Sequence, residues 1–145
     1  MSRRHHLESR LYTGEFVDES LKLHRGLGPG LMESVYEVVL AKSLALRGLT
    51  VERQMPFAFE YAGIVFEEGL RVDLLVEKRV IVELKSVEKL SPVHAKQVLT
   101  YLRLMNLSVG LLINFGAPTL KEGLQRIVNN FQPSSAQLRV NRRGE

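Results

Sequence analysis

The sequence has 145 residues, of which 45% are hydrophobic and 25% charged, and it contains no cysteine. This composition suits one globular domain and excludes a disordered chain, disulfide bonds, zinc–thiolate sites and a cysteine nucleophile. No apolar segment approaches the roughly 18 residues of a membrane-spanning helix, so a cytoplasmic location is expected. The net charge of +4 arises in the arginine-bearing ends, because residues 11–131 are balanced. We therefore expect flexible basic termini at 1–14 and 132–145 around one domain at 15–131.

Two helices are expected in the first third of the chain. Residues 15–26 have helical character and end at glycine and proline turn signals. A second helix, rich in Leu, Val, Ala and Glu, is expected from Leu31 to Arg47, with Gly48 as the residue that ends it. Short strands are expected to follow at 50–54, 56–61 and 64–68.

The strongest strand patterns are LRVDLLV at 70–76 and VIVELKSV at 80–87, separated by a charged turn at 77–79. The second of these is nearly continuous in apolar residues, which is typical of a strand that is buried on both faces. These two strands therefore form the expected centre of a sheet.

The second half of the chain has the pattern of a helix, a strand and a helix. Pro92 opens a helix that is expected to reach about Asn106, and the apolar segment at 109–115 predicts another buried strand. A final helix is expected from Thr119, and its apolar face would consist of Leu120, Leu124, Ile127, Val128 and Phe131. This order predicts an α/β domain with helices packed on a central sheet.

Three charged residues interrupt the two strongest strands. Glu83 and Lys85 point to the same face of their strand, about 6.6 Å apart along it. Asp73 interrupts the preceding strand. Burial of an ionised group is costly unless the group is paired or binds a counter-ion. The pattern therefore predicts either a salt-bridge cluster, in which Lys85 pairs with Glu83 or Asp73, or a metal site.

The length of the turn decides whether the two carboxylates meet. With a three-residue turn at 77–79, Val76 pairs with Val80. Asp73 then lies opposite Glu83 on the same face, whereas a two-residue turn would send them to opposite faces. Facing carboxylates about 5 Å apart would repel each other unless a divalent cation lay between them. Oxygen ligands favour Mg²⁺, Mn²⁺ or Ca²⁺ over zinc.

A metal site of this composition fits phosphodiester hydrolysis. Asp73 and Glu83 would hold the ion, together with the backbone carbonyl of Leu84. The ion would polarise the scissile phosphate and lower the pKa of a bound water. Lys85 would orient that water or help to deprotonate it, and no other nucleophile is needed.

The helix after these strands carries His94, Gln97 and Tyr101 along one stripe, at positions i, i+3 and i+7. Gln97 and Tyr101 could contact a phosphate or fix a metal-bound water. The alternative is a helix flank with a half-buried tyrosine. His94 is expected to be a hydrogen-bonding residue at the rim rather than a ligand.

The second helix offers two further carboxylates. Glu33 and Glu37 share a face because they are four residues apart, and either could reach the ion directly or through water. The helix dipole alone could also explain a glutamate at the position of Glu33.

Together these features resemble the PD-(D/E)XK nuclease superfamily. Asp73 looks like the strand aspartate of that superfamily, and Glu83–Leu84–Lys85 looks like its E-x-K motif. Gln97 and Tyr101 look like the Q-x-x-x-Y helix motif of its exonuclease branch.

A narrower resemblance involves Gly30, Glu33 and Tyr36, which form the motif G-x-x-E-x-x-Y. With the downstream segments VELKSV, HAKQVLTYL and LLINFG, this motif is similar to the small bacterial GxxExxY proteins. The resemblance spans about residues 15–131 and favours Glu33 as a site residue.

The resemblance implies a three-layer α/β/α restriction-endonuclease-like core with a central mixed β-sheet. It also implies a Mg²⁺ site, at which Mn²⁺ is plausible, and the convergence of Glu33, Asp73, Glu83, Lys85, Gln97 and Tyr101. The implied function is a metal-dependent nuclease that acts on nucleic acid, with DNA preferred as the substrate and RNA left open, and a homodimer is compatible with it by analogy. Two alternatives stay open: a non-catalytic module that keeps the fold and binds nucleic acid or protein, and a structural domain whose charges form a salt-bridge cluster.

Overall fold

The computed structural model describes residues 15–130 and 138–142. In chain order, the described elements are α2 (Glu15–Leu27), α3 (Glu33–Leu46), β1 (Val51–Tyr61), β2 (Ile64–Val76), β3 (Val80–Lys85), α4 (Pro92–Met105), β4 (Val109–Asn114), α5 (Leu120–Gly123), β5 (Leu124–Val128) and β6 (Leu138–Arg142). The first three predicted helices are confirmed, with ends that differ by one or two residues, and both strands beside the charged turn are confirmed, although β2 begins six residues before the predicted start at Leu70.

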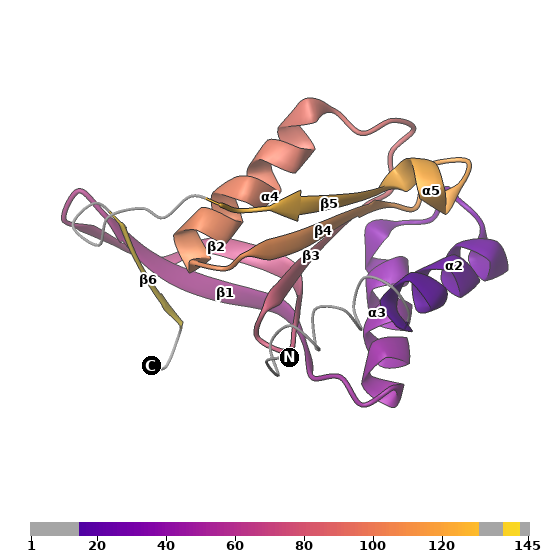
Figure 1. Cartoon of the computed structure of the whole chain (residues 1–145), viewed down its shortest axis with the longest axis horizontal. Helices are drawn as coiled ribbons and strands as arrows, with labels where there is room; N and C mark the ends of the chain where they lie inside the picture. Colours follow the sequence, from indigo (N-terminus) through magenta and orange to yellow (C-terminus); the bar gives the residue numbers. More distant parts are fainter. Residues whose placement is uncertain (1–14, 131–137, 143–145) are drawn as a thin grey trace.

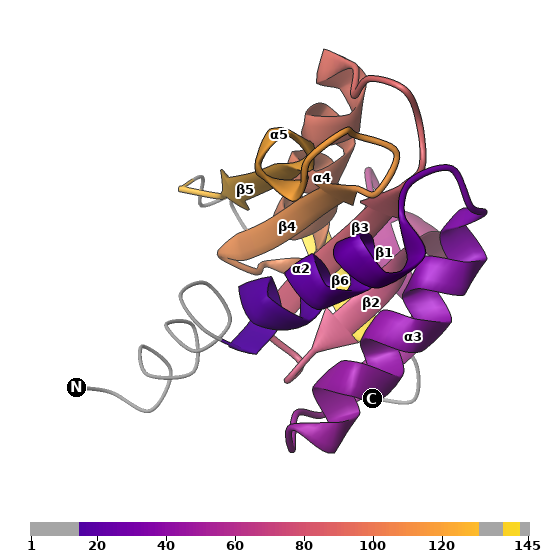
Figure 2. The same ribbon diagram turned by 90° about the vertical axis from the view of Figure 1, so that its right-hand side faces the viewer.

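The strands form one mixed sheet in the order β5-β4-β3-β2-β1-β6. Strands β3 and β4 are parallel and are connected through α4, whereas the other neighbouring strands are antiparallel. Figures 1 and 2 show α4 over one face of the sheet and α2 with α3 over the other. The predicted three-layer α/β/α architecture with a central mixed sheet is therefore confirmed.

Each face of the sheet has its own hydrophobic core. Val80 and Val82 of β3 belong to the core beneath α2 and α3. Ile81 belongs to the core beneath α4. Because side chains alternate along a strand, Glu83 and Lys85 belong to the face that α4 covers.

Strands β1 and β2 form a long hairpin where the sequence predicts shorter strands. The segments at 50–54 and 56–61 are parts of the continuous β1, and the segments at 64–68 and 70–76 are parts of β2. The turn between them contains Ala62 and Gly63, which have φ values of 53° and 78°. Positive φ at both central residues is typical of the two-residue turns that close antiparallel hairpins.

The prediction of one long helix from Thr119 onward is wrong. Helix α5 ends at Gly123, and the chain continues as strand β5, antiparallel to β4. Gly123 lies so close to β4 that a Cβ atom there would be 2.3 Å from the carbonyl oxygen of Asn114. The edge of β4 offers backbone hydrogen bonds to residues 124–128. These residues therefore form a strand, although their apolar spacing also fits a helix. Phe131 lies outside the described residues.

The ends of the chain are described only in part. Residues 138–142, which the sequence assigned to a flexible tail, form β6 and pair with β1. The predictions for 1–14 and for the rest of 132–145 lie outside the described residues. Within the described ranges, no helix is long and apolar enough to cross a membrane.

Candidate active site

The turn between β2 and β3 has the three-residue length that brings the two carboxylates together. Val76 pairs with Val80, and the ladder continues to Leu74 opposite Val82. The next position along this register places Asp73 opposite Glu83, as expected for a three-residue turn. The paired ladder ends before that position, so β2 and β3 separate where the two carboxylates meet.

Asp73 and Glu83 bind backbone groups of each other's strands in this gap. The N–H of Asp73 donates to Oε1 of Glu83 at 3.1 Å, and the N–H of Leu84 donates to Oδ2 of Asp73 at 2.8 Å. The carboxylates therefore satisfy amide groups at the point where the ladder stops. Glu83 is 5% exposed, and Asp73 is half-buried.

The site is strongly anionic when both acids are ionised. Burial, followed by the negative charge of Asp73, raises the pKa of Glu83 to about 8, and the nearby ammonium of Lys85 opposes this shift. No ion pair joins Lys85 to either acid among the described residues, so a salt-bridge cluster does not offset their repulsion. A cation placed between the acids would stabilise the ionised form of Glu83.

Helix α4 contributes the predicted polar pair. The side-chain amide of Gln97 donates to the hydroxyl oxygen of Tyr101 at 3.2 Å. Burial, followed by the negative charge of Glu83, raises the pKa of Tyr101, and Asp73 adds to this effect. Tyr101 is therefore within electrostatic range of both acids.

His94 has a local role at the start of α4. The backbone N–H of Ser91 donates to its Nδ1 at 3.1 Å. This contact satisfies an amide beside the helix start and agrees with the expectation of a hydrogen-bonding residue rather than a ligand.

Tyr36, the tyrosine of the G-x-x-E-x-x-Y motif, has a structural role. The hydroxyl of Tyr36 donates to the carbonyl oxygen of Gly28 at 2.6 Å and accepts from the N–H of Leu31 at 3.1 Å. Its ring stacks on Phe115 with a centroid separation of 4.4 Å. Tyr36 therefore holds the loop before α3 in place, and Ser86, directly after β3, donates to the carbonyl oxygen of Leu31 in the same loop.

Glu33 is not joined to the two acids by any contact. It is exposed at the start of α3, and its side chain makes no hydrogen bond or ion pair with another described residue. Glu37, one turn later, is buried and is linked to Asp73 through Gln54. The i, i+4 spacing of the two glutamates indicated both, but the sequence did not show that only the second is linked to Asp73 through a described residue.

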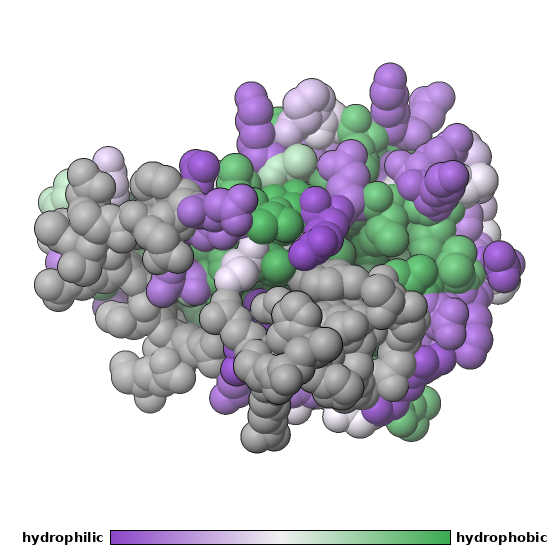
Figure 3. Space-filling model, viewed as in Figure 1, coloured by the Kyte–Doolittle hydropathy of each residue, from purple (hydrophilic) through white to green (hydrophobic). Residues whose placement is uncertain are grey.

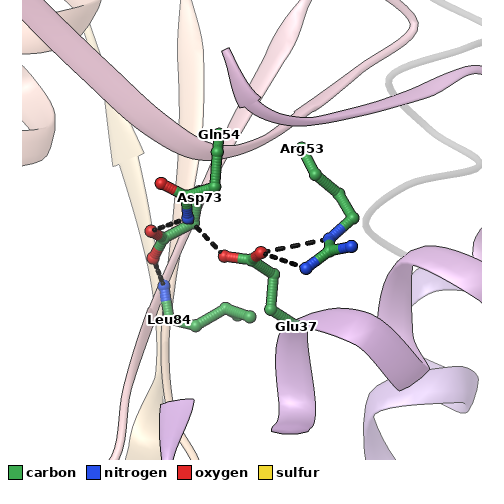
Figure 4. Close-up of polar contacts among 5 residues, drawn as sticks. All are labelled: Glu37, Arg53, Gln54, Asp73 and Leu84. Atoms are coloured by element: carbon green, nitrogen blue, oxygen red, sulfur yellow. Dashed lines mark hydrogen bonds and ion pairs between the residues drawn. The ribbon is translucent and has the colours of Figure 1, made fainter. Parts of the chain in front are cut away.

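Gln54 and Arg53 are site residues that the sequence did not indicate. Figure 4 shows Gln54 between Glu37 and Asp73, with Arg53 on the far side of Glu37. Arg53 donates through Nε to Oε2 of Glu37 at 3.1 Å, and its terminal nitrogen lies 3.0 Å from the same oxygen. No motif in the sequence distinguishes these residues from other polar residues of a strand.

A separate cavity of about 340 Å³ lies between α2 and α5. Its lining residues are Leu21, His24, Arg25, Pro118, Thr119, Leu120 and Lys121. Hydrophobic surface is visible over this region on the right of the space-filling view (Figure 3). None of the predicted site residues lines this cavity, so it is distinct from the carboxylate site.

The fold and the Asp73 and E-x-K residues at its centre define the class of restriction-endonuclease-like proteins. The family model of the PD-(D/E)XK nuclease superfamily matches residues 11–127, and the chain belongs to this superfamily. Comparison with curated proteins and with solved structures gave no significant match.

The donor set at the strand gap fits a hard divalent cation of the Mg²⁺ type. The two carboxyl groups lie close together there, and no ion pair among the described residues compensates the charge of Glu83 when it is ionised. No group of three or more His, Cys, Asp or Glu side chains gathers in the described ranges. Mg²⁺ is commonly bound by one or two carboxylates together with water and substrate oxygens, so the two carboxylates are compatible with such an ion.

Proposed function

We propose that the protein is a Mg²⁺-dependent nuclease that hydrolyses phosphodiester bonds in DNA. The observation that supports the proposal most directly is the contact of Asp73 with the buried Glu83 across the gap between β2 and β3, with Lys85 following on the same strand. The G-x-x-E-x-x-Y motif of Gly30, Glu33 and Tyr36 adds the proposal of a GxxExxY-type protein within the superfamily.

Asp73, Glu83 and the backbone carbonyl of Leu84 would hold the ion. The N–H of Leu84 points to Asp73 on β2, and the carbonyl of the same residue points to the same side of an extended strand. When bound, a divalent cation polarises the scissile phosphate and makes the attacking water more acidic. Glu33 stays a proposed further ligand, at the start of the helix whose preceding loop contacts Ser86.

Three side chains would act on the substrate and the water. Lys85 orients the attacking water and offsets the charge that develops on the phosphate. Gln97 and Tyr101 supply an amide and a hydroxyl that contact phosphate oxygens from the side of α4. Because the two residues already bond to each other, they present a pre-arranged pair.

Cleavage assays with purified protein test this proposal. We expect Mg²⁺- or Mn²⁺-dependent cleavage of DNA, reduced at least about 100-fold in Lys85→Ala and in Asp73→Ala, because each change removes a group that acts in the transition state. Lys121→Ala, an exposed lysine on α5, is the control that should retain activity.

The substrates should include single-stranded, duplex and branched DNA and RNA. Absence of cleavage of every substrate with both ions contradicts the proposal. If nucleic-acid binding is salt-sensitive, needs no metal and persists in Lys85→Ala, the chain is instead a non-catalytic binding module with a nuclease fold. A cytoplasmic location remains a proposal that rests on composition alone.

We also propose that the chain forms a homodimer through the outer side of α3. Met32, Val35, Val39, Lys42 and Leu46 follow one another at alternating intervals of three and four residues, which is the spacing of a two-helix seam. The four apolar residues of this seam are 38% to 79% exposed. The opposite side of α3, with Tyr36, Leu40 and Leu44, is the one buried against the sheet.

The charge in this seam favours an antiparallel second copy. In a parallel pair the two Lys42 ammonium groups would face each other, whereas in an antiparallel pair each lies near Val35 of the other copy. The seam is about two heptads long, so we expect it to bury less than the roughly 800 Å² per partner of a standard interface. We therefore expect a weak, concentration-dependent dimer.

A further inference from the structure

Gln54 has a left-handed backbone conformation inside β1, with a φ of 51°. On either side of it, Arg53 pairs with Leu74 and Met55 pairs with Val72 in the same register. The positive φ of Gln54 is therefore not caused by a β-bulge with an extra residue in β1. A side chain with a Cβ atom is strained in this conformation, and such strain persists where the surrounding contacts require it.

The left-handed conformation brings two neighbouring side chains to one carboxylate. In a regular strand, Arg53 and Gln54 would point to opposite faces of the sheet. Here both donate to Glu37 of α3, Arg53 to Oε2 and Gln54 to Oε1, the latter at 2.6 Å (Figure 4). The unusual φ is thus explained by this shared partner.

The amide of Gln54 also reaches Asp73. The same nitrogen that donates to Glu37 donates to Oδ1 of Asp73 at 3.1 Å. Both partners are carboxylates, which only accept, so the amide nitrogen and not the oxygen must face them. Gln54 therefore bridges a helix and a strand through its two N–H groups.

These contacts fix the Asp73 carboxylate from two strands. Gln54 of β1 donates to one oxygen of Asp73, and the N–H of Leu84 of β3 donates to the other. Arg53 neutralises Glu37, so Glu37 can hold the amide without adding net charge beside the site. Asp73 is left with limited freedom to rotate.

We propose that Gln54 is a positioning residue, which Glu37 and Arg53 hold in place so that it fixes the Asp73 carboxylate for binding a divalent cation. This inference rests on the proposed function, because it requires Asp73 to be a metal ligand. Residues that orient metal ligands commonly change metal affinity or activity by 10- to 100-fold when they are replaced.

The variant Gln54→Gly tests the proposal, because glycine adopts the same backbone conformation without strain and removes only the side chain. We expect its dissociation constant for Mn²⁺, measured by calorimetry, to be about 10-fold higher than that of the unchanged protein or more. Its unfolding temperature should not fall. Ala62→Gly is the matched control, because Ala62 has a φ of 53° at the far end of the hairpin and should keep the Mn²⁺ affinity.

A second variant separates positioning from a general loss of packing. Glu37→Gln keeps an acceptor for Gln54 but loses the charge that pairs with Arg53, so we expect a smaller loss of Mn²⁺ affinity than in Gln54→Gly. In cleavage assays, Gln54→Gly should raise the metal concentration for half-maximal rate more than it lowers the rate at saturating metal.

An unchanged Mn²⁺ affinity in Gln54→Gly, beside clear binding by the unchanged protein, overturns the positioning role and leaves the proposed nuclease function standing. If the unchanged protein binds no Mn²⁺, the proposed metal-dependent function fails, and the positioning role fails with it.

Discussion

At the scale of single residues, Glu83 is a buried acid whose pKa is raised by its position in the sheet. Glu83 is 5% exposed, and it faces another acid because the three-residue turn sets the register. Burial and the charge of Asp73 hold its pKa at about 8, above the ordinary value of 4.5. Without a cation, and between pH 4.5 and about 8, the folded protein therefore keeps a proton on Glu83 that the unfolded chain releases.

This difference predicts how stability depends on pH in the absence of metal. Between pH 4.5 and about 8 the folded state binds more protons than the unfolded state at this position, so the free energy of unfolding falls as the pH rises. The contribution from Glu83 has a slope of at most about 1.4 kcal/mol per pH unit. Glu83→Gln should flatten the slope, which urea unfolding in the presence of a chelator at several pH values would measure.

The exposed Glu67 on β2 provides the control, since Glu67→Gln should leave the slope unchanged. Addition of Mg²⁺ at pH 8 should stabilise the unchanged protein more than Glu83→Gln, because a cation favours the ionised carboxylate. Equal slopes in the unchanged protein and in Glu83→Gln would show that Glu83 is not the group responsible.

At the scale of elements, the sequence predicted the part of the site that depends on local geometry. The turn at 77–79 sets the register, and the two-residue period of strands then places Asp73 opposite Glu83. The three- and four-residue spacing of α4 likewise placed Gln97 beside Tyr101.

The sequence did not predict strand β5, because residues 124–128 form a strand only by pairing with β4. Leu124 and Ile127 fit one helical face as well as a strand, and the edge of β4 decides between the two. Gly123 permits the close approach that this pairing needs. The spacing of apolar residues within one segment does not reveal its pairing with another strand, so it could not predict the contact of β5 with β4.

Gly123→Ala tests this explanation of β5. The added Cβ would lie 2.3 Å from the carbonyl oxygen of Asn114, so the turn must shift, and we expect a loss of about 2 kcal/mol in the free energy of unfolding. Gly26→Ala is the control, since a Cβ there meets no atom within 4 Å. That change, at a helical position in α2, should be neutral or stabilising. Similar stabilities of the two variants would contradict the tight packing of α5 against β4.

At the scale of the whole molecule, α3 has an apolar side toward the sheet and a second one toward solvent. This outer seam predicts self-association, which light scattering across a concentration series would detect as a rise toward twice the monomer mass. Val39→Lys, at the centre of the seam, should keep the protein monomeric, because it places two ammonium groups together. Val93→Lys on α4, where the valine is 62% exposed, should not change the association. A monomer at every concentration would rule out the dimer.

The sequence by itself determined the fold class and the two strands that carry Asp73 and Glu83, and it limited their register to two alternatives set by the length of the turn; the structure has the three-residue turn. These features follow from repeat periods and turn length, which act over a few residues. Only the tertiary structure decided that Glu37 rather than Glu33 is linked to Asp73, that Gln54 connects them, and that β5 is a strand. Each of these depends on contacts between segments that are distant in the chain, where the packing of the sheet and its helices overrides local preference.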